Sequence, residues 1–202
     1  MDSGNRLEGK NILVIIPRDH YDEDQLEPLL EKLQAEGADV RVASTKFKEA
    51  VGMKNGRHMP DMLVVDAIEG ITGDAYVSSG KGVRQVKGIF HGTIAVGGKG
   101  ARKTLWKEKL VRLLFTDRYK SGMVVGAIGN SVPCLAEADL IRNMEVSAAI
   151  DKHTQPMLEQ AAAILSDEPV SNFDRIVTAS GPEAMDEFCE EVIKEIAKTK
   201  EK

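Results

Sequence analysis

Apolar residues in this chain form short continuous runs that alternate with segments in which they recur at helical spacing. Residues 11–17 are rich in β-branched side chains and end at a proline, which is typical of a buried parallel strand. Leucines then recur at helical spacing up to Gly37, and residues 38–44 predict a second strand. Pro28 implies that the helix either starts just before the proline or is kinked there. Strand, helix and strand in this order predict a βαβ unit with a right-handed crossover.

The same alternation continues to the end of the chain. Further strands are predicted at residues 62–68, 93–96, 123–128, 146–150 and 174–180. Further helices are predicted at residues 105–114, after Pro133, at residues 155–165 and from Pro182 onward. Residues 75–77 and 83–86 flank a glycine-containing turn, which predicts a hairpin excursion within residues 69–91. The order predicts one α/β domain over residues 1–202, a doubly wound and mostly parallel sheet with helices on both faces and frayed ends at residues 1–10 and 198–202.

Composition and charge narrow the class of protein. The 202 residues are 42% hydrophobic and 29% charged, and the net charge of −5 gives no reason to expect a nucleic acid or a membrane as partner. No segment approaches the roughly 18 apolar residues of a membrane span, and residues 1–10 lack the apolar core of a signal peptide. Cys134 and Cys189 make neither a disulfide framework nor a metal site, and the histidines show no metal-ligand spacing. We therefore expect a cytoplasmic protein without metal or cofactor.

Residues 123–140 have the pattern of a nucleophile elbow. The buried strand stops at Gly129, Asn130 and Ser131, and Pro133 lies in the first turn of the following helix, where a missing N–H costs no hydrogen bond. A strand, a sharp turn and a helix in this order hold one side chain above the carboxyl edge of a parallel sheet. The tip of this turn is Gly129, which has no side chain. The pattern therefore predicts the backbone of a nucleophile elbow without a nucleophilic side chain.

Polar or small residues follow three of the predicted strands, and the carboxyl ends of parallel strands meet at one edge of a sheet. His20 and Asp22 follow the first strand and are the best polar pair for a pocket. Gly97 and Gly98 follow another strand, and their N–H groups, with that of Asn130, are candidates for binding an oxyanion. The alternative is that the glycines only form a tight turn and that the acidic residues near His20 form a solvated loop.

These residues also carry a family resemblance. Residues 125–140, Val-Gly-Ala-Ile-Gly-Asn-Ser-Val-Pro-Cys-Leu-Ala-Glu-Ala-Asp-Leu, resemble the elbow of the ThiJ/PfpI (intracellular protease I-like) superfamily, which is roughly Ala-Ile-Cys-His-Gly-Pro-x-x-Leu-Ala-x-Ala-Gly-Leu. Tyr21-Asp22-Glu23 is similar to the family's Phe-Glu-Asp, and Val96-Gly97-Gly98 to its Pro-Gly-Gly. Residues 167–183 are similar to its closing Asp-Glu-Pro-Val…Gly-Pro segment, whereas residues 69–91 are the least similar. The resemblance implies a flavodoxin-like fold and assembly as a homodimer or a larger homo-oligomer.

The resemblance also identifies departures from the family pattern. The family's nucleophilic cysteine corresponds to Gly129, the histidine after it to Asn130, and the next glycine to Ser131. The family's glutamate that hydrogen-bonds the cysteine corresponds to Asp22. Covalent catalysis by the family's route needs a thiolate. The resemblance therefore implies a catalytically degenerate protein that keeps the pocket and binds a small molecule or a partner.

Two other functions remain open on the sequence. An active hydrolase of the peptidase, amidase or deglycase type would use Ser131, or Asp22 with His20. Pro133 interrupts the Gly-x-Ser-x-Gly pattern around Ser131, and no partner histidine is evident. A scaffold protein would use residues 69–91 for contacts between subunits. The two cysteines lie among apolar residues and are interpreted as buried side chains rather than reactive thiols.

Overall fold

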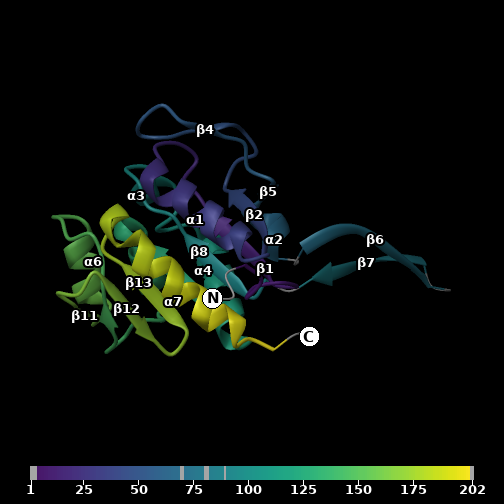
Figure 1. Cartoon of the computed structure of the whole chain (residues 1–202). Coiled ribbons are helices and arrows are strands. Elements are labelled where there is room, and N and C mark those ends of the chain that lie inside the picture. The colour runs from purple at the N-terminus through teal and green to yellow at the C-terminus, as the bar shows by residue number, and fades with distance from the viewer. Residues whose placement is uncertain (1–3, 69–70, 80–81, 89, 201–202) are drawn as a thin grey trace.

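A seven-stranded sheet with helices on both sides forms the body of the molecule (Figure 1). The computed structural model describes residues 4–68, 71–79, 82–88 and 90–200. The strand order is β12-β13-β9-β8-β1-β2-β5, and every neighbouring pair is parallel except β12 and β13. This confirms the predicted flavodoxin-like, mostly parallel sheet. Its strands are β1 (Asn11–Ile15), β2 (Asp39–Ser44), β5 (Met62–Leu63), β8 (Gly92–Ala95), β9 (Val124–Ile128), β12 (Val170–Phe173) and β13 (Ile176–Ala179).

The helices bury the two faces of the sheet in two separate apolar clusters. The central strands are buried on both faces, so each face needs its own layer of helices. Leu29 of α1 and Phe188 of α7 belong to the cluster on one face. Leu114 of α4, Leu135 of α5 and Leu158 of α6 belong to the cluster on the other. The helices are α1 (Glu23–Ala35), α2 (Val64–Ile68), α3 (Ala101–Thr104), α4 (Lys109–Lys120), η1 (Gly129–Ser131), α5 (Pro133–Glu137), α6 (Thr154–Gln160), η2 (Pro182–Ala184) and α7 (Met185–Ala197).

Smaller strand pairs lie outside the main sheet. The hairpin predicted within residues 69–91 is confirmed as β6 (Ile71–Ser79) and β7 (Gly82–Gly88), and it extends away from the body of the molecule (Figure 1). The centre of its glycine-containing turn, residues 80–81, lies outside the described residues. Two further pairs are β3 (Ala50–Val51) with β4 (Arg57–His58), and β10 (Glu145–Val146) with β11 (Ile164–Leu165). Among the helices of the described ranges, none is long and apolar enough to cross a membrane.

The strand predicted at residues 62–68 is wrong in most of its length. Only Met62 and Leu63 pair in the sheet, and α2 follows directly. A short apolar run without clear periodicity does not distinguish a strand from a buried helix. Val64 and Ala67 are three residues apart and both are buried, which is the spacing of one helix face.

The predictions for residues 146–165 are also corrected. Of the strand predicted at residues 146–150, only Val146 pairs, in the two-residue strand β10. The helix predicted at residues 155–165 ends at Gln160, and Ala162 adopts a left-handed φ of 56°. Ile164, expected to pack in that helix, is 55% exposed and instead pairs with β10 through β11. Tertiary strand pairing therefore overrides the helix propensity of the alanines before it.

Two other predicted elements differ in their limits. The helix expected at residues 105–114 forms only from Lys109, as α4, whereas α3 ends before residue 105; Leu105 and Trp106 lie buried between the two helices. The strand expected at residues 174–180 is β13, and it begins only at Ile176. Asp174 and Arg175 have left-handed φ values of 46° and 67° because they form the turn of a β12–β13 hairpin that the apolar pattern did not reveal. α1 starts at Glu23, so Pro28 lies inside the helix.

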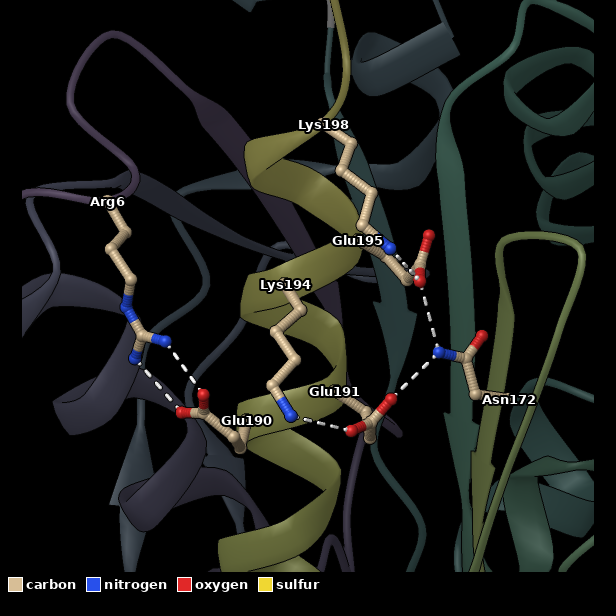
Figure 2. A network of polar contacts seen from close by, with 7 residues as sticks. All are labelled: Arg6, Asn172, Glu190, Glu191, Lys194, Glu195 and Lys198. Atoms are coloured by element: carbon tan, nitrogen blue, oxygen red, sulfur yellow. Dashed lines mark hydrogen bonds and ion pairs between the residues drawn. The ribbon is translucent and has the colours of Figure 1, made fainter.

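The two ends of the described chain are attached to the body. Leu7 is fully buried, and the Arg6 guanidinium pairs with Glu36, directly after α1, and with Glu190 of α7. Figure 2 shows the Arg6–Glu190 pair beside a second group, in which the Asn172 amide donates to Glu191 and Glu195. Glu191 also pairs with Lys194, and Glu195 with Lys198. Near the other end, Lys10 Nζ donates to the Thr199 carbonyl at 2.7 Å. Within the described residues, these contacts oppose the fraying expected at both ends.

The packing of α7 against the sheet gives the first prediction. Phe188 is fully buried, whereas Phe173 in the edge strand β12 is 57% exposed. We expect Phe188→Ala to lower the free energy of unfolding by about 3–5 kcal/mol, because it leaves a cavity in the core. The matched substitution Phe173→Ala should lower it by less than about 1 kcal/mol. Urea denaturation followed by circular dichroism measures both, and equal effects would contradict this account of the core.

Candidate functional site

The predicted strand–turn–helix corner is present at the carboxyl end of β9. The strand runs directly into η1, and Pro133 occupies the first turn of α5. Gly129 has a φ of 59°, a left-handed conformation that costs other residues about 1–2 kcal/mol. The Gly129 carbonyl accepts a hydrogen bond from Ala149 N at 3.2 Å. The corner therefore has the backbone geometry in which glycine is favoured.

The space beside Gly129 holds the side chain of Gln25. A Cβ at Gly129 would lie 3.1 Å from Gln25 Nε2, which is tighter than ordinary van der Waals contact. Gln25 lies in the first turn of α1 and is only 3% exposed. Sequence reasoning assigned the residue facing the elbow to Asp22 by resemblance, but the structure places Gln25 there. The spacing of Asp22 and Gln25 matches a capping box, which marks the start of a helix but does not indicate that Gln25 faces the elbow.

The two glycine N–H groups predicted to bind an oxyanion are both occupied by side chains of this chain. Gly97 N donates to Gln25 Oε1 at 2.7 Å, and Gly98 N donates to Asn130 Oδ1 at 2.8 Å. An incoming anion would have to displace both amide oxygens to reach these donors. The structure therefore favours the alternative interpretation, in which the glycines form a tight turn.

Gly98 is required at its position for reasons of space. Its φ is 123°, and a Cβ there would collide with the His20 carbonyl oxygen and the Asp22 backbone nitrogen. Asp22 N donates to the Gly97 carbonyl at 3.0 Å, which joins the turn to the start of α1. The close approach of these two segments brings the ends of β1 and β8 together, as predicted for one edge of a parallel sheet.

Asp22 has a structural role at the start of α1. Its Oδ1 accepts from Asp24 N at 3.0 Å and caps the helix, and its Oδ2 accepts from Gln25 Nε2 at 3.1 Å. An ionised carboxylate only accepts hydrogen bonds, so Asp22 turns the amide nitrogen of Gln25 toward itself and the amide oxygen toward Gly97. Burial raises the pKa of Asp22, although the Asp24 N–H opposes this. Folding therefore favours the protonated form of Asp22. The stability that this preference contributes is complete below the pKa of Asp22 in the unfolded chain, and it is lost as pH rises through the raised pKa of the folded state.

The other candidate side chains are not directed into a shared pocket. Ser131 is fully buried, and its Oγ donates to the Val96 carbonyl at 2.7 Å. His20 is exposed and has a left-handed φ of 56°, and its backbone N–H donates to the Val51 carbonyl at 2.5 Å. The structure thus brings Asp22, Gly97 and Asn130 together around Gln25. It leaves the His20 ring at the surface and turns Ser131 toward the sheet.

The acidic residues after β1 attach a neighbouring segment rather than forming a free loop. Glu23 is 5% exposed, and its Oε1 accepts from Lys54 N at 2.8 Å and Gly56 N at 2.9 Å. Asp19 pairs with Lys48 at 2.6 Å. These contacts hold the β3–β4 segment against the start of α1. The solvated loop expected from the sequence is therefore a docking site for residues 48–56.

Neither cysteine has the environment of a reactive thiol. Cys134 and Cys189 are buried and unpaired. Burial raises the pKa of both thiols, that of Cys189 to about 12, so both are protonated at neutral pH. In the part of the chain that the structure describes, histidine, cysteine and acidic side chains do not gather into a group of three that could hold a metal ion.

Comparisons with known proteins agree with this fold. The model of the DJ-1/PfpI family matches residues 10–195. The chain is 28% identical over 197 residues to an uncharacterized protein of Methanocaldococcus jannaschii, which covers 98% of this chain and 87% of that protein. The ThiJ/PfpI domain protein from Brachyspira murdochii superposes with a TM-score of 0.78 at 20% identity, covering 98% of this chain and 99% of that chain. Drosophila melanogaster DJ-1beta superposes with a TM-score of 0.74 at 19% identity, covering 94% of this chain and 91% of that chain.

The contacts of Gln25 give the second prediction. We expect Gln25→Ala to lower the free energy of unfolding by about 1–3 kcal/mol, because it leaves Gly97 N–H and one Asp22 oxygen without partners in a buried site. Gln34→Ala on the exposed side of the same helix is the control and should change it by less than about 0.5 kcal/mol. Chemical denaturation of both variants tests this, and a neutral Gln25→Ala would show that the amide does not close the site.

Proposed function

The chain belongs to the DJ-1/PfpI family, and on that premise we propose that it is a non-catalytic member that binds a small ligand or a partner. One observation carries the proposal. Gly129, at the tip of the elbow, offers no nucleophile, and Gln25 Nε2 lies 3.1 Å from the place where its Cβ would be. A covalent mechanism needs both a nucleophile and room for the group that it attacks. The elbow supplies neither.

The closed glycine turn supports the same proposal. Stabilising a developing oxyanion requires N–H donors that are aimed at the reacting group before it arrives. Here Gly97 N–H and Gly98 N–H already donate to Gln25 and Asn130. Using them for catalysis would first break one buried and one partly buried hydrogen bond, and an unpaired buried group costs about 1–3 kcal/mol.

The alternative function is a hydrolase of the peptidase, amidase or deglycase type. The raised pKa of Asp22 is the observation that favours it, because perturbed carboxyl groups are candidates for general acid–base catalysis. Both oxygens of Asp22 already accept hydrogen bonds from α1, however, and the residue is 8% exposed. Ser131 donates to Val96 O and has no base beside it in the contacts described above. The non-catalytic function is therefore the better supported one.

Assembly into a homodimer or a larger homo-oligomer remains part of the proposal, as the resemblance to the family implies. The β6–β7 hairpin is the segment we expect to contact another subunit, because it extends away from the body of the molecule (Figure 1). Sedimentation of the whole chain beside a variant lacking residues 71–88 would reveal whether the hairpin is needed for assembly.

The chemistry of the elbow gives the third prediction. We expect the native protein to turn over neither methylglyoxal nor peptides, and to resist iodoacetamide because both of its thiols are buried. Gly129→Cys combined with Gln25→Ala should introduce one thiol that iodoacetamide labels in the folded protein, and Gly129→Ala with Gln25→Ala should stay unlabelled. Mass spectrometry after labelling identifies the site.

Two results would contradict the proposal in different ways. Turnover by the native protein that Ser131→Ala or Asp22→Asn abolishes would show that the protein is a hydrolase. A Gly129→Cys, Gln25→Ala variant that is folded by circular dichroism yet unlabelled would show that residue 129 does not occupy an accessible elbow tip.

A further inference from the structure

A cationic groove lies beside the elbow, between α3 and the start of α6. Its volume is about 330 Å³, which is within the range of roughly 300–1,000 Å³ found for small-molecule sites. Three of its lining residues are cations with exposed positions, and carboxylates are absent from the lining. The lining residues are Arg102, Trp106, Lys107, Lys152, His153, Pro156 and Met157.

The inner wall of the groove is apolar and its rim is positively charged. Pro156 and Met157 form this wall together with the small part of Trp106, 5% of the residue, that reaches the surface. Arg102 and Lys152 come from the two sides of the groove, from α3 and from the turn before α6. Aromatic and aliphatic walls with a few charged groups are the usual composition of a site for an organic ion. A planar ring can lie on such a wall while its anionic group contacts the rim.

Hydrogen bonds already orient the groups on both sides. Arg102 Nη1 lies 2.9 Å from His153 Nε2. Because a guanidinium only donates hydrogen bonds, the histidine nitrogen is the acceptor. This contact orients the planar guanidinium of Arg102. Asp151, which precedes Lys152, accepts at Oδ1 from the N–H groups of His153 and Thr154 at 2.6 and 2.8 Å. The positive charge of the rim is therefore not paired with this acid.

Both sides of the groove are attached to the elbow turn. Trp106 Nε1 donates to the Asn130 carbonyl at 2.6 Å. On the other side, Ala149 N donates to the Gly129 carbonyl at 3.2 Å, and the Ala149 carbonyl accepts from Thr154 Oγ1 at 2.6 Å. These contacts hold the two sides at a fixed separation. A rigid, preformed site loses less conformational entropy when a ligand binds.

A neighbouring hollow lacks these properties. It shares Met157, but its charged lining consists of Glu137, Asp139 and Arg142, and Arg142 already pairs with Asp139 at 3.3 Å. Two carboxylates and one guanidinium give it no positive excess. The groove between α3 and α6 is thus distinguished by its sign of charge as well as by its aromatic wall.

We propose that the groove between α3 and α6 binds a small organic anion in which a phosphate or carboxylate is joined to a planar apolar ring. The anionic group contacts Arg102 and Lys152, and the ring contacts Pro156, Met157 and the exposed part of Trp106. The inference rests on the proposed function, because it gives a non-catalytic binding protein a site outside its closed elbow.

Phenyl phosphate tests this site, and Trp106 is the only tryptophan in the sequence and so reports binding directly. We expect saturable binding by calorimetry, with a parallel change in Trp106 fluorescence. Inorganic phosphate, which lacks the ring, and benzyl alcohol, which lacks the charge, should each bind at least about tenfold more weakly. Equal binding of inorganic phosphate and phenyl phosphate would overturn the proposed class of ligand.

Charge-removing variants locate the site. Arg102→Gln should raise the Kd for phenyl phosphate about tenfold, and Lys152→Gln about threefold. Lys103→Gln is the matched control, because Lys103 is exposed on the same short helix but does not line the groove, and it should change the Kd less than about twofold. Lys152 is exposed, so its variant keeps the test valid if Arg102→Gln disturbs folding.

Failure of this inference is distinguishable from failure of the proposed function. No saturable binding of phenyl phosphate up to about 10 mM, or an equal effect of Lys103→Gln and Lys152→Gln, would overturn the groove site and leave the non-catalytic elbow untouched. Turnover of methylglyoxal or peptides by the native protein would overturn the proposed function whatever the groove binds.

Discussion

The elbow is closed because the buried polar groups around Gln25 must form hydrogen bonds with one another. Asp22 accepts from the amide nitrogen of Gln25, and the amide oxygen accepts from Gly97 N–H. Each of these groups is buried, so removing one partner leaves another without a hydrogen bond, which lowers the free energy of unfolding by about 1–3 kcal/mol. The same side chain occupies the space next to Gly129. One series of hydrogen bonds therefore caps a helix, closes a glycine turn and holds Gln25 beside Gly129.

The elbow joins several parts of the molecule. Asn130 contributes its amide oxygen to Gly98 N–H and its carbonyl to Trp106, while Gly129 O accepts from Ala149 and Ser131 Oγ donates to Val96. Every polar group named here is directed at another part of the same chain. The corner connects β8, β9 and the segments beside α3 and α6. The adjacent groove, whose sides are attached to this corner, is the more accessible surface for a ligand.

The sequence was sufficient for the central strands of the main sheet, but not for its edge strands β5 and β12 or for the segments around it. Continuous apolar runs predicted β1, β9 and their parallel arrangement, because strands buried on both faces need such runs. The same criterion failed at residues 62–68 and 146–165, where short segments are decided by tertiary pairing rather than by local preference. The corner at Gly129 was predictable from its small residues and Pro133. The role of Gln25 was not, because only the folded chain brings α1 against the ends of β8 and β9. Trp106, which carries no motif, was missed for the same reason.

The central claim is that the elbow is closed by the side chains of its own protein. Amide hydrogen exchange of Gly97 and Gly98, measured by NMR, tests it most directly, because a buried and hydrogen-bonded N–H exchanges only when the structure around it opens. The account predicts strong protection of both amides in the native protein, unchanged in the presence of added phosphate or formate. Rapid exchange of Gly97 N–H, or a large shift of its resonance on adding either anion, would show an open oxyanion-binding turn and contradict the account.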